Sequence, residues 1–210
     1  MRAQWRAALA LVGMALAAPL SAQETPAGDP VRGQALSYTC LGCHGIENYK
    51  NVAPVYSVPK LYGQSPQAIV DALKGYKSGE RSHATMHAHA ASASEQDMWD
   101  MAVYLAGPVL KPGDVKQIGT PPAAAQVCVA CHGNNGISVA PNYPHLAGQH
   151  RDYLAQTLRD YKRGGRKNAV MAGFMAALKN EDIKQLATYY AAQQPGLRTV
   201  PKRVTILSQR

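Results

Sequence analysis

The chain has 210 residues, four cysteines and a formal net charge of +9. It has no apolar run as long as the ~20 residues that a membrane-spanning helix needs, which argues against an integral membrane protein. The charge is uneven, because residues 23–110 carry six Lys and Arg against eight Asp and Glu, whereas residues 121–210 carry twelve against four.

Residues 1–22 have the pattern of a Sec signal peptide. Arg2 and Arg6 precede an apolar run from Ala7 to Leu20, and the small residue Ala22 suits signal peptidase. An uncleaved membrane anchor is the alternative, but the apolar run is too short to span a bilayer. We therefore expect cleavage after Ala22 and export of the remaining chain as a soluble protein.

Two pentapeptides use all four cysteines: Cys40-Leu41-Gly42-Cys43-His44 and Cys128-Val129-Ala130-Cys131-His132. Two thiols three positions apart can bond both vinyl groups of a haem, and the adjacent imidazole can ligate one face of its iron. A zinc site is the alternative, but zinc sites usually place a second ligand pair a dozen or more residues away. The sequence predicts two covalent haem c groups, held through Cys40, Cys43, Cys128 and Cys131. In an exported bacterial chain, such attachment indicates the periplasm.

The chain contains two copies of one unit. The block Pro59-Lys60-Leu61-Tyr62-Gly63-Gln64 returns as Pro144-His145-Leu146-Ala147-Gly148-Gln149, displaced by 85 residues. The haem motifs are 88 residues apart, so the first copy has three extra residues in the loop after its motif. We expect domains at 23–107 and 123–194, a Pro- and Gly-rich linker at 108–122, and a C-terminal tail at 195–210.

Hydrophobic spacing predicts helices throughout and no sheet. Ile69, Leu73 and Tyr76 share a helical face after Ser65-Pro66, which suit a cap and a first turn. The second copy repeats this pattern from Tyr153 to Tyr161. Final helices are expected from about Ser94 to Ala106 and from Asn180 to Gln193, since each begins with acidic N-terminal signals. The predicted fold class is all-α.

His44 and His132 are the predicted proximal iron ligands, because the motif places each beside its own thioether bonds. The other ring nitrogen should donate to a backbone carbonyl, which orients the ring. Pro54 and Pro141, in matching Val-Ala-Pro segments, are the candidates for that carbonyl; the alternative is that they are ordinary loop prolines.

Met86 and Met171 are the predicted ligands on the other face of each iron, because they match at the 85-residue displacement. Both are expected in a loop before the final helix. Met98, Met101 and Met175 are expected in the core, with Met175 as the alternative second ligand.

The first ligand segment differs from the second in its histidines. His83, His87 and His89 surround Met86, so His87 or His89 is the alternative ligand there. The choice matters, since a thioether raises the haem potential relative to a second imidazole.

These motifs resemble the cytochrome c4 family of dihaem periplasmic cytochromes, built from two tandem class I cytochrome c domains. The resemblance covers most of residues 30–194, through Cys-x-x-Cys-His-Gly, Pro-x-Leu-x-Gly-Gln, Tyr-Lys-x-Gly-x-Arg and the Met-x-Gly segment at Met171. The first half departs from the last pattern at Ala88, and the tail lies beyond the usual end. The resemblance implies pseudo-twofold packing of the domains, haem propionates that face each other, and electron transfer towards terminal oxidases.

An iron ligated on both faces has no open position for a substrate, so the ligand set predicts outer-sphere electron transfer. We expect a monomer that meets a respiratory donor complex and a terminal oxidase, and no nucleic acid. One alternative is an electron-accepting subunit of a dehydrogenase complex. Another is a peroxidase or thiosulfate-oxidising enzyme with an atypical first haem.

The basic second domain has two interpretations. It is either a solvated surface, with charge partly offset by haem propionates, or a face that docks an acidic partner or an anionic membrane. The second interpretation includes peripheral membrane association. Tyr76, Tyr161, Arg81 and Arg166 recur at matched positions, either at the propionates and the domain interface or as ordinary helix-end residues.

Overall fold

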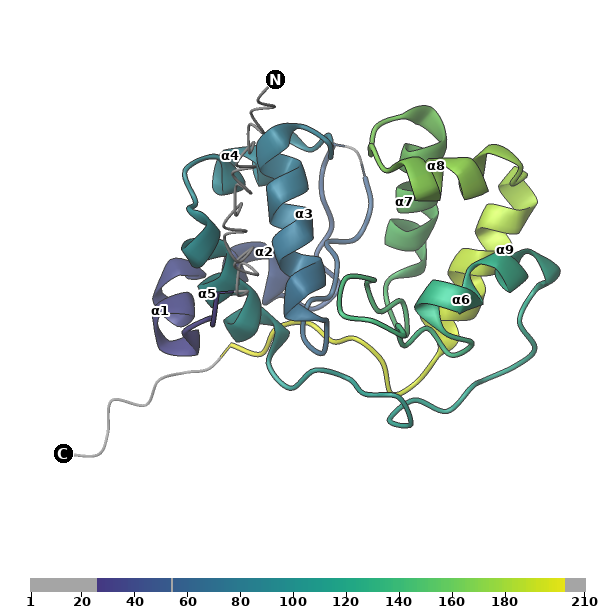
Figure 1. The fold of residues 1–210 in the computed structure, drawn as a ribbon, viewed down its shortest axis with the longest axis horizontal. Helices are drawn as coiled ribbons and strands as arrows, with labels where there is room; N and C mark the ends of the chain where they lie inside the picture. The colour runs from purple at the N-terminus through teal and green to yellow at the C-terminus, as the bar shows by residue number, and fades with distance from the viewer. Residues whose placement is uncertain (1–25, 54, 203–210) are drawn as a thin grey trace, which may run out of the picture.

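The computed structural model describes residues 26–53 and 55–202, which form two helical lobes (Figure 1). The expected signal peptide and Pro54 lie outside the described residues. Among the described residues there are isolated β-bridges but no strands, so the all-α prediction is confirmed. The first lobe contains α1 (Pro30–Leu36), α2 (Leu41–His44), α3 (Pro66–Ser78), α4 (Ala84–Ala91) and α5 (Glu95–Ala106). The second contains the 3-10 helix η1 (Ala123–Val127), α6 (Val129–His132), α7 (Arg151–Arg163), α8 (Ala169–Ala176) and α9 (Asn180–Ala192).

Each lobe has its own apolar core beneath a matched set of helices. In the first lobe α5 packs against α1 and α3, and in the second α9 packs against η1 and α7. Met98 and Met101 of α5 and Met175 of α8 are buried, as expected for core methionines. The cores are small, so a bound cofactor would supply much of the apolar interior of each lobe.

Local capping explains where the matched helices begin and end. The Ser94 hydroxyl and the Asp97 carboxylate form a reciprocal capping box at the start of α5. Gly79 and Gly164 end α3 and α7 with φ of 78° and 80°, a left-handed conformation that favours glycine. Ser65 occupies the N-cap position of α3, but its hydroxyl donates to the Pro141 carbonyl of the other lobe at 2.6 Å. That side chain therefore contributes to the lobe interface rather than to the cap.

Two glutamines join the lobes by a repeated pattern of hydrogen bonds. Gln64 Oε1 accepts from His145 N at 2.7 Å, and Gln64 Nε2 donates to His145 O at 3.0 Å. Gln149 makes the same pair of contacts with Lys60, both at 3.0 Å. Gln64 and Gln149 match at the 85-residue displacement, and so do Lys60 and His145. The lobes therefore meet with the pseudo-twofold symmetry that the resemblance implied.

No helix in the described part of the chain combines the length and the apolar character needed to cross a membrane.

Candidate functional site

The two histidines predicted as proximal ligands are buried and contact backbone carbonyls. His44 Nδ1 lies 2.9 Å from Pro59 O, and His132 Nδ1 lies 2.9 Å from Pro144 O. With Nδ1 engaged, Nε2 of each ring is left to bind iron. Burial lowers the pKa of both imidazoles, although the carbonyls oppose this shift. Both rings are thus kept in the neutral form that ligation requires.

The prediction that Pro54 and Pro141 supply these carbonyls is wrong. In the first lobe the loop after His44 closes on itself, with Asn51 N donating to Tyr56 O, and brings Pro59 back to the ring. Pro54 itself lies outside the described residues. In the second lobe Pro141 O is occupied by a hydroxyl of the other lobe.

Pro59 and Pro144 open the repeated Pro-x-Leu-x-Gly-Gln blocks, and this repetition was the signal that could have identified them. They follow their histidines by 15 and 12 residues, so the three-residue insertion lies between His44 and Pro59.

Met86 and Met171 lie in the first turns of α4 and α8, so the expectation that they lie in loops is wrong. Each helix begins one residue after a capping side chain: His83 Nδ1 accepts from Met86 N at 3.3 Å, and Asn168 Oδ1 accepts from Met171 N at 2.9 Å. In each helix the N-cap side chain accepts from the amide of the methionine three residues later, which would otherwise be unpaired in the first turn. Both thioethers are thereby carried on short, rigid elements.

The histidines around Met86 have different surroundings. His87 Nδ1 lies 2.8 Å from Tyr76 O, so this ring faces the backbone of α3. His89 lines the cavity that Met86 also lines. It occupies the position that Phe174 has in the second lobe, by the 85-residue displacement. Of the two histidines expected as alternative ligands, His89 lines this cavity and His87 does not.

One cavity of about 820 Å³ extends through both lobes and brings the predicted haem residues together. Its lining includes the four cysteines, both motif histidines and both candidate methionines: Cys40, Cys43, Cys128, Cys131, His44, His132, Met86 and Met171. Each lobe thus offers two thiols, an imidazole and a thioether to one largely apolar space. This donor set fits a covalent haem with two axial ligands.

A cluster of tyrosines and arginines closes the cavity between the lobes. Arg81 and Arg166 form an antiparallel bridge across the interface, with Ser82 N donating to Gly165 O at 2.9 Å. Arg166 is 6% exposed, lies 5.4 Å from the Tyr153 ring centroid and donates to its hydroxyl at 3.2 Å. The guanidinium of Arg81 lies 5.7 Å from the Tyr76 centroid. The recurring Tyr and Arg residues are therefore interface residues that line the cavity.

The cytochrome c family model matches residues 30–107 and 122–193. Cytochrome c4 of Azotobacter vinelandii is 30% identical over 210 residues, covering 86% of this chain and 96% of that protein. This chain belongs to the cytochrome c4 family.

Two further similarities concern a solved structure and a second curated protein. The structure of reduced recombinant cytochrome c4 from Pseudomonas stutzeri has a TM-score of 0.61 and 27% identity, covering 82% of this chain and all of that one. A thiosulfate dehydrogenase electron acceptor of Stutzerimonas stutzeri is 30% identical over 171 residues, covering 72% of this chain and 77% of that protein. The protein is a dihaem electron carrier rather than an enzyme, with two covalent haem c groups in tandem cytochrome c domains.

Proposed function

We propose that this cytochrome carries electrons in the periplasm between a respiratory donor and a terminal oxidase. In this proposal Cys40 and Cys43 hold the first haem and Cys128 and Cys131 the second. The axial pairs are His44 with Met86 and His132 with Met171. The observation that supports the proposal is that each imidazole and its matching thioether line one cavity, so that both could serve as ligands to an iron held there.

The ligand pairs determine the chemistry. Haem c supplies an iron that changes between the ferrous and ferric states. His44 and Met86 would hold the first iron and leave no position there for a substrate, and His132 and Met171 would do the same in the second site. The carbonyls of Pro59 and Pro144 orient the imidazoles, so that little rearrangement accompanies the change of charge.

The lobe interface supports transfer within one molecule. Gln64 and Gln149 fix the separation of the two sites through their backbone contacts. The guanidinium groups of Arg81 and Arg166 line the cavity where the lobes meet, a place suited to haem propionates. Two guanidinium cations at that place would offset the negative charge of the propionates that two facing haems bring.

The oxidised absorption spectrum tests the proposed ligands. The near-infrared band of a Met-ligated ferric haem should appear with the intensity of two haems, and cyanide or peroxide should not change the spectrum at low concentration. Half of that intensity would remove Met86 from the ligand set and favour His89, which also lines the cavity.

A second candidate function is an electron-accepting subunit bound to a dehydrogenase. The similarity to a thiosulfate dehydrogenase electron acceptor favours it. Purification of the tagged protein from its native membrane and periplasmic fractions separates the two. The carrier should elute alone as a monomer, whereas co-elution of a catalytic polypeptide in equal amount supports the subunit.

A further inference from the structure

The described part of the C-terminal tail, residues 195–202, is here called the strap. It leaves α9 in the second lobe and returns across the first lobe, as the yellow segment of Figure 1 shows. Leu197 N donates to Ala147 O of the second lobe at 2.8 Å. One residue later, Arg198 exchanges two backbone hydrogen bonds with Tyr62 of the first lobe, at 2.9 and 3.0 Å. The strap is thus attached to both lobes.

The strap is packed as part of the interior. Leu197 and Val200 are each 2% exposed, and Val200 belongs to the apolar core of the first lobe. Gly196 passes so close to the second lobe that a Cβ there would lie 2.5 Å from Ala147 O. A segment with this burial and this close approach has one defined path rather than a loose surface position.

The strap also reaches the first proximal ligand. Val200 N donates to the backbone carbonyl of His44 at 3.0 Å. On the other side of His44, Nδ1 contacts Pro59 O, and Tyr62, which pairs with the strap, lies three residues after Pro59. The strap therefore contacts both segments that orient the His44 ring.

We propose that the strap is a positioning element for His44, through which the second lobe holds the proximal side of the first haem. Val200 is its decisive positioning residue, because its amide contacts the ligand residue and its side chain anchors that amide in the core. This inference rests on the proposed ligation of the first iron by His44.

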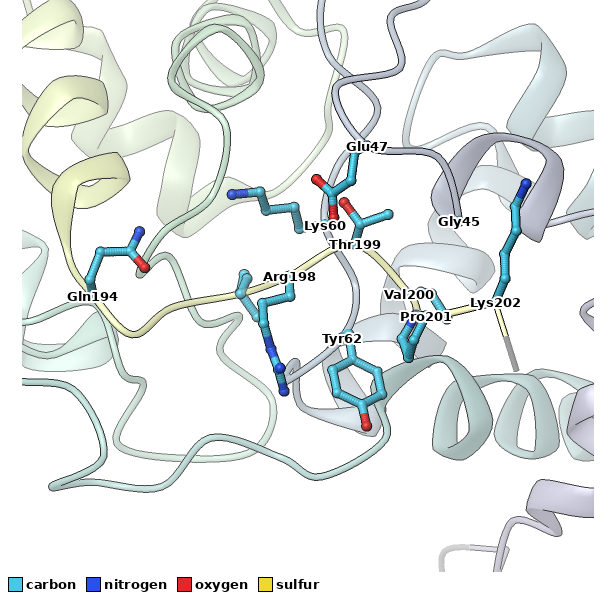
Figure 2. Close-up of a pocket in the computed structure, with 11 residues that line it drawn as sticks. Gly45, Glu47, Lys60, Tyr62, Gln194, Arg198, Thr199, Val200, Pro201 and Lys202 are labelled. Carbon is cyan, nitrogen blue, oxygen red and sulfur yellow. The ribbon is translucent and has the colours of Figure 1, made fainter. Parts of the chain in front are cut away.

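Ligand binding is a less suitable role for this surface. A hollow of about 590 Å³ lies beside the strap and includes Glu47, Lys60, Arg198 and Lys202 in its lining. Figure 2 shows that these side chains point in different directions rather than towards a common point. Lys60 Nζ already donates to Gly148 O at 2.7 Å, and the Arg198 guanidinium lies 4.9 Å from the Tyr62 ring centroid.

Two substitutions separate the amide from the side chain. Val200→Pro removes the N–H that contacts His44, whereas Val200→Ala keeps it and removes only apolar volume. The midpoint potential of each haem is measured separately in the holoprotein from its haem-methyl NMR signals. Val200→Pro should lower the potential of the first haem, since the unpaired carbonyl dipole favours the ferric state, and leave the second unchanged. Val200→Ala, which keeps the amide and loosens only its anchor, should lower the denaturation midpoint and shift the first potential less than Val200→Pro does, with the second unchanged.

The proposal would be overturned if the first haem had the same potential in the two variants. It would also be overturned if Val200→Pro shifted the potentials of both haems equally. Should Val200→Pro fail to fold, amide hydrogen exchange in the unmodified protein gives an independent test. The Val200 and Arg198 amides should exchange as slowly as the core amides of α5, and exchange at the rate of an open chain would overturn the proposal. The ligation of the first iron is tested separately by the spectrum of the unmodified protein and its lack of response to cyanide or peroxide, so the failure of one proposal is distinguishable from the failure of the other.

Discussion

Replacement of Gln64 tests whether the glutamine pairs hold the lobes together. Gln64 is 7% exposed and makes two hydrogen bonds to the backbone of His145, which is 6% exposed. Gln64→Ala removes both bonds, together with the bond that Gln64 Oε1 accepts from Ser65 N at 3.0 Å, and leaves the buried backbone N–H and C=O of His145 unpaired. A net hydrogen bond contributes roughly 0.5–1.5 kcal/mol and a buried unpaired group costs roughly 1–3 kcal/mol, so the expected loss of stability is about 2–4 kcal/mol.

The assay is equilibrium unfolding in guanidinium chloride, followed at the haem absorption of the purified holoprotein. Gln149→Ala should cost a similar amount, because Gln149 makes the equivalent contacts to Lys60. Gln67→Ala is the matched control: its side chain bonds to Asp71 within the same helix at the surface, so about 0.5 kcal/mol or less is expected. A Gln64→Ala loss no larger than that of the control would refute the reasoning.

Other substitutions test the ligands, their caps and the acidic contact at the interface. Met86→His and Met171→His should each remove half of the near-infrared band and lower the potential of one haem, which a redox titration measures. His83→Asn should keep the near-infrared band of the first haem, since Asn168 provides the same cap in the second lobe. His83→Ala removes the cap and should weaken that band. Asp152 Oδ2 accepts from Ser57 N and Oγ across the interface, and although burial opposes it, these bonds lower the pKa of Asp152. The contribution of Asp152 to the free energy of unfolding should therefore be complete above the unfolded pKa of about 3.9 and be lost as the pH falls below that value. Asp152→Asn should remove that part of the acid dependence of unfolding.

The sequence was sufficient for features that recur at a fixed displacement. The matched methionines and the paired helices follow from the 85-residue repeat, and the two Cys-x-x-Cys-His motifs recur at 88 residues because of the insertion between them and the repeated blocks. The three-residue insertion was also predictable, and the histidine-to-proline spacings of 15 and 12 residues agree with it. Repetition identifies these residues because each copy provides an independent test of the other.

Contacts that depend on the path of a loop were not predictable in this way. Matching tripeptides favour Pro54 and Pro141, but the fold of the post-haem loop decides which carbonyl reaches the ring. Asn168 is a preferred N-cap residue, so the start of α8 before Met171 was predictable from it, whereas His83 is not a usual cap and gave no such signal for α4. The contact of Val200 with His44 joins residues far apart in sequence and has no counterpart in the repeat.

The symmetric and asymmetric contacts affect different properties of a two-centre relay. Fast transfer between two haems needs a fixed separation, and the pseudo-symmetric glutamine pairs supply it equally to both lobes. Directional transfer needs a difference in potential, which two identical sites could not provide. Two departures from symmetry, His89 in place of Phe174 and the contact of Val200 with His44, lie at the first site. We infer that the second lobe keeps the simpler site and that the first sets the difference in potential.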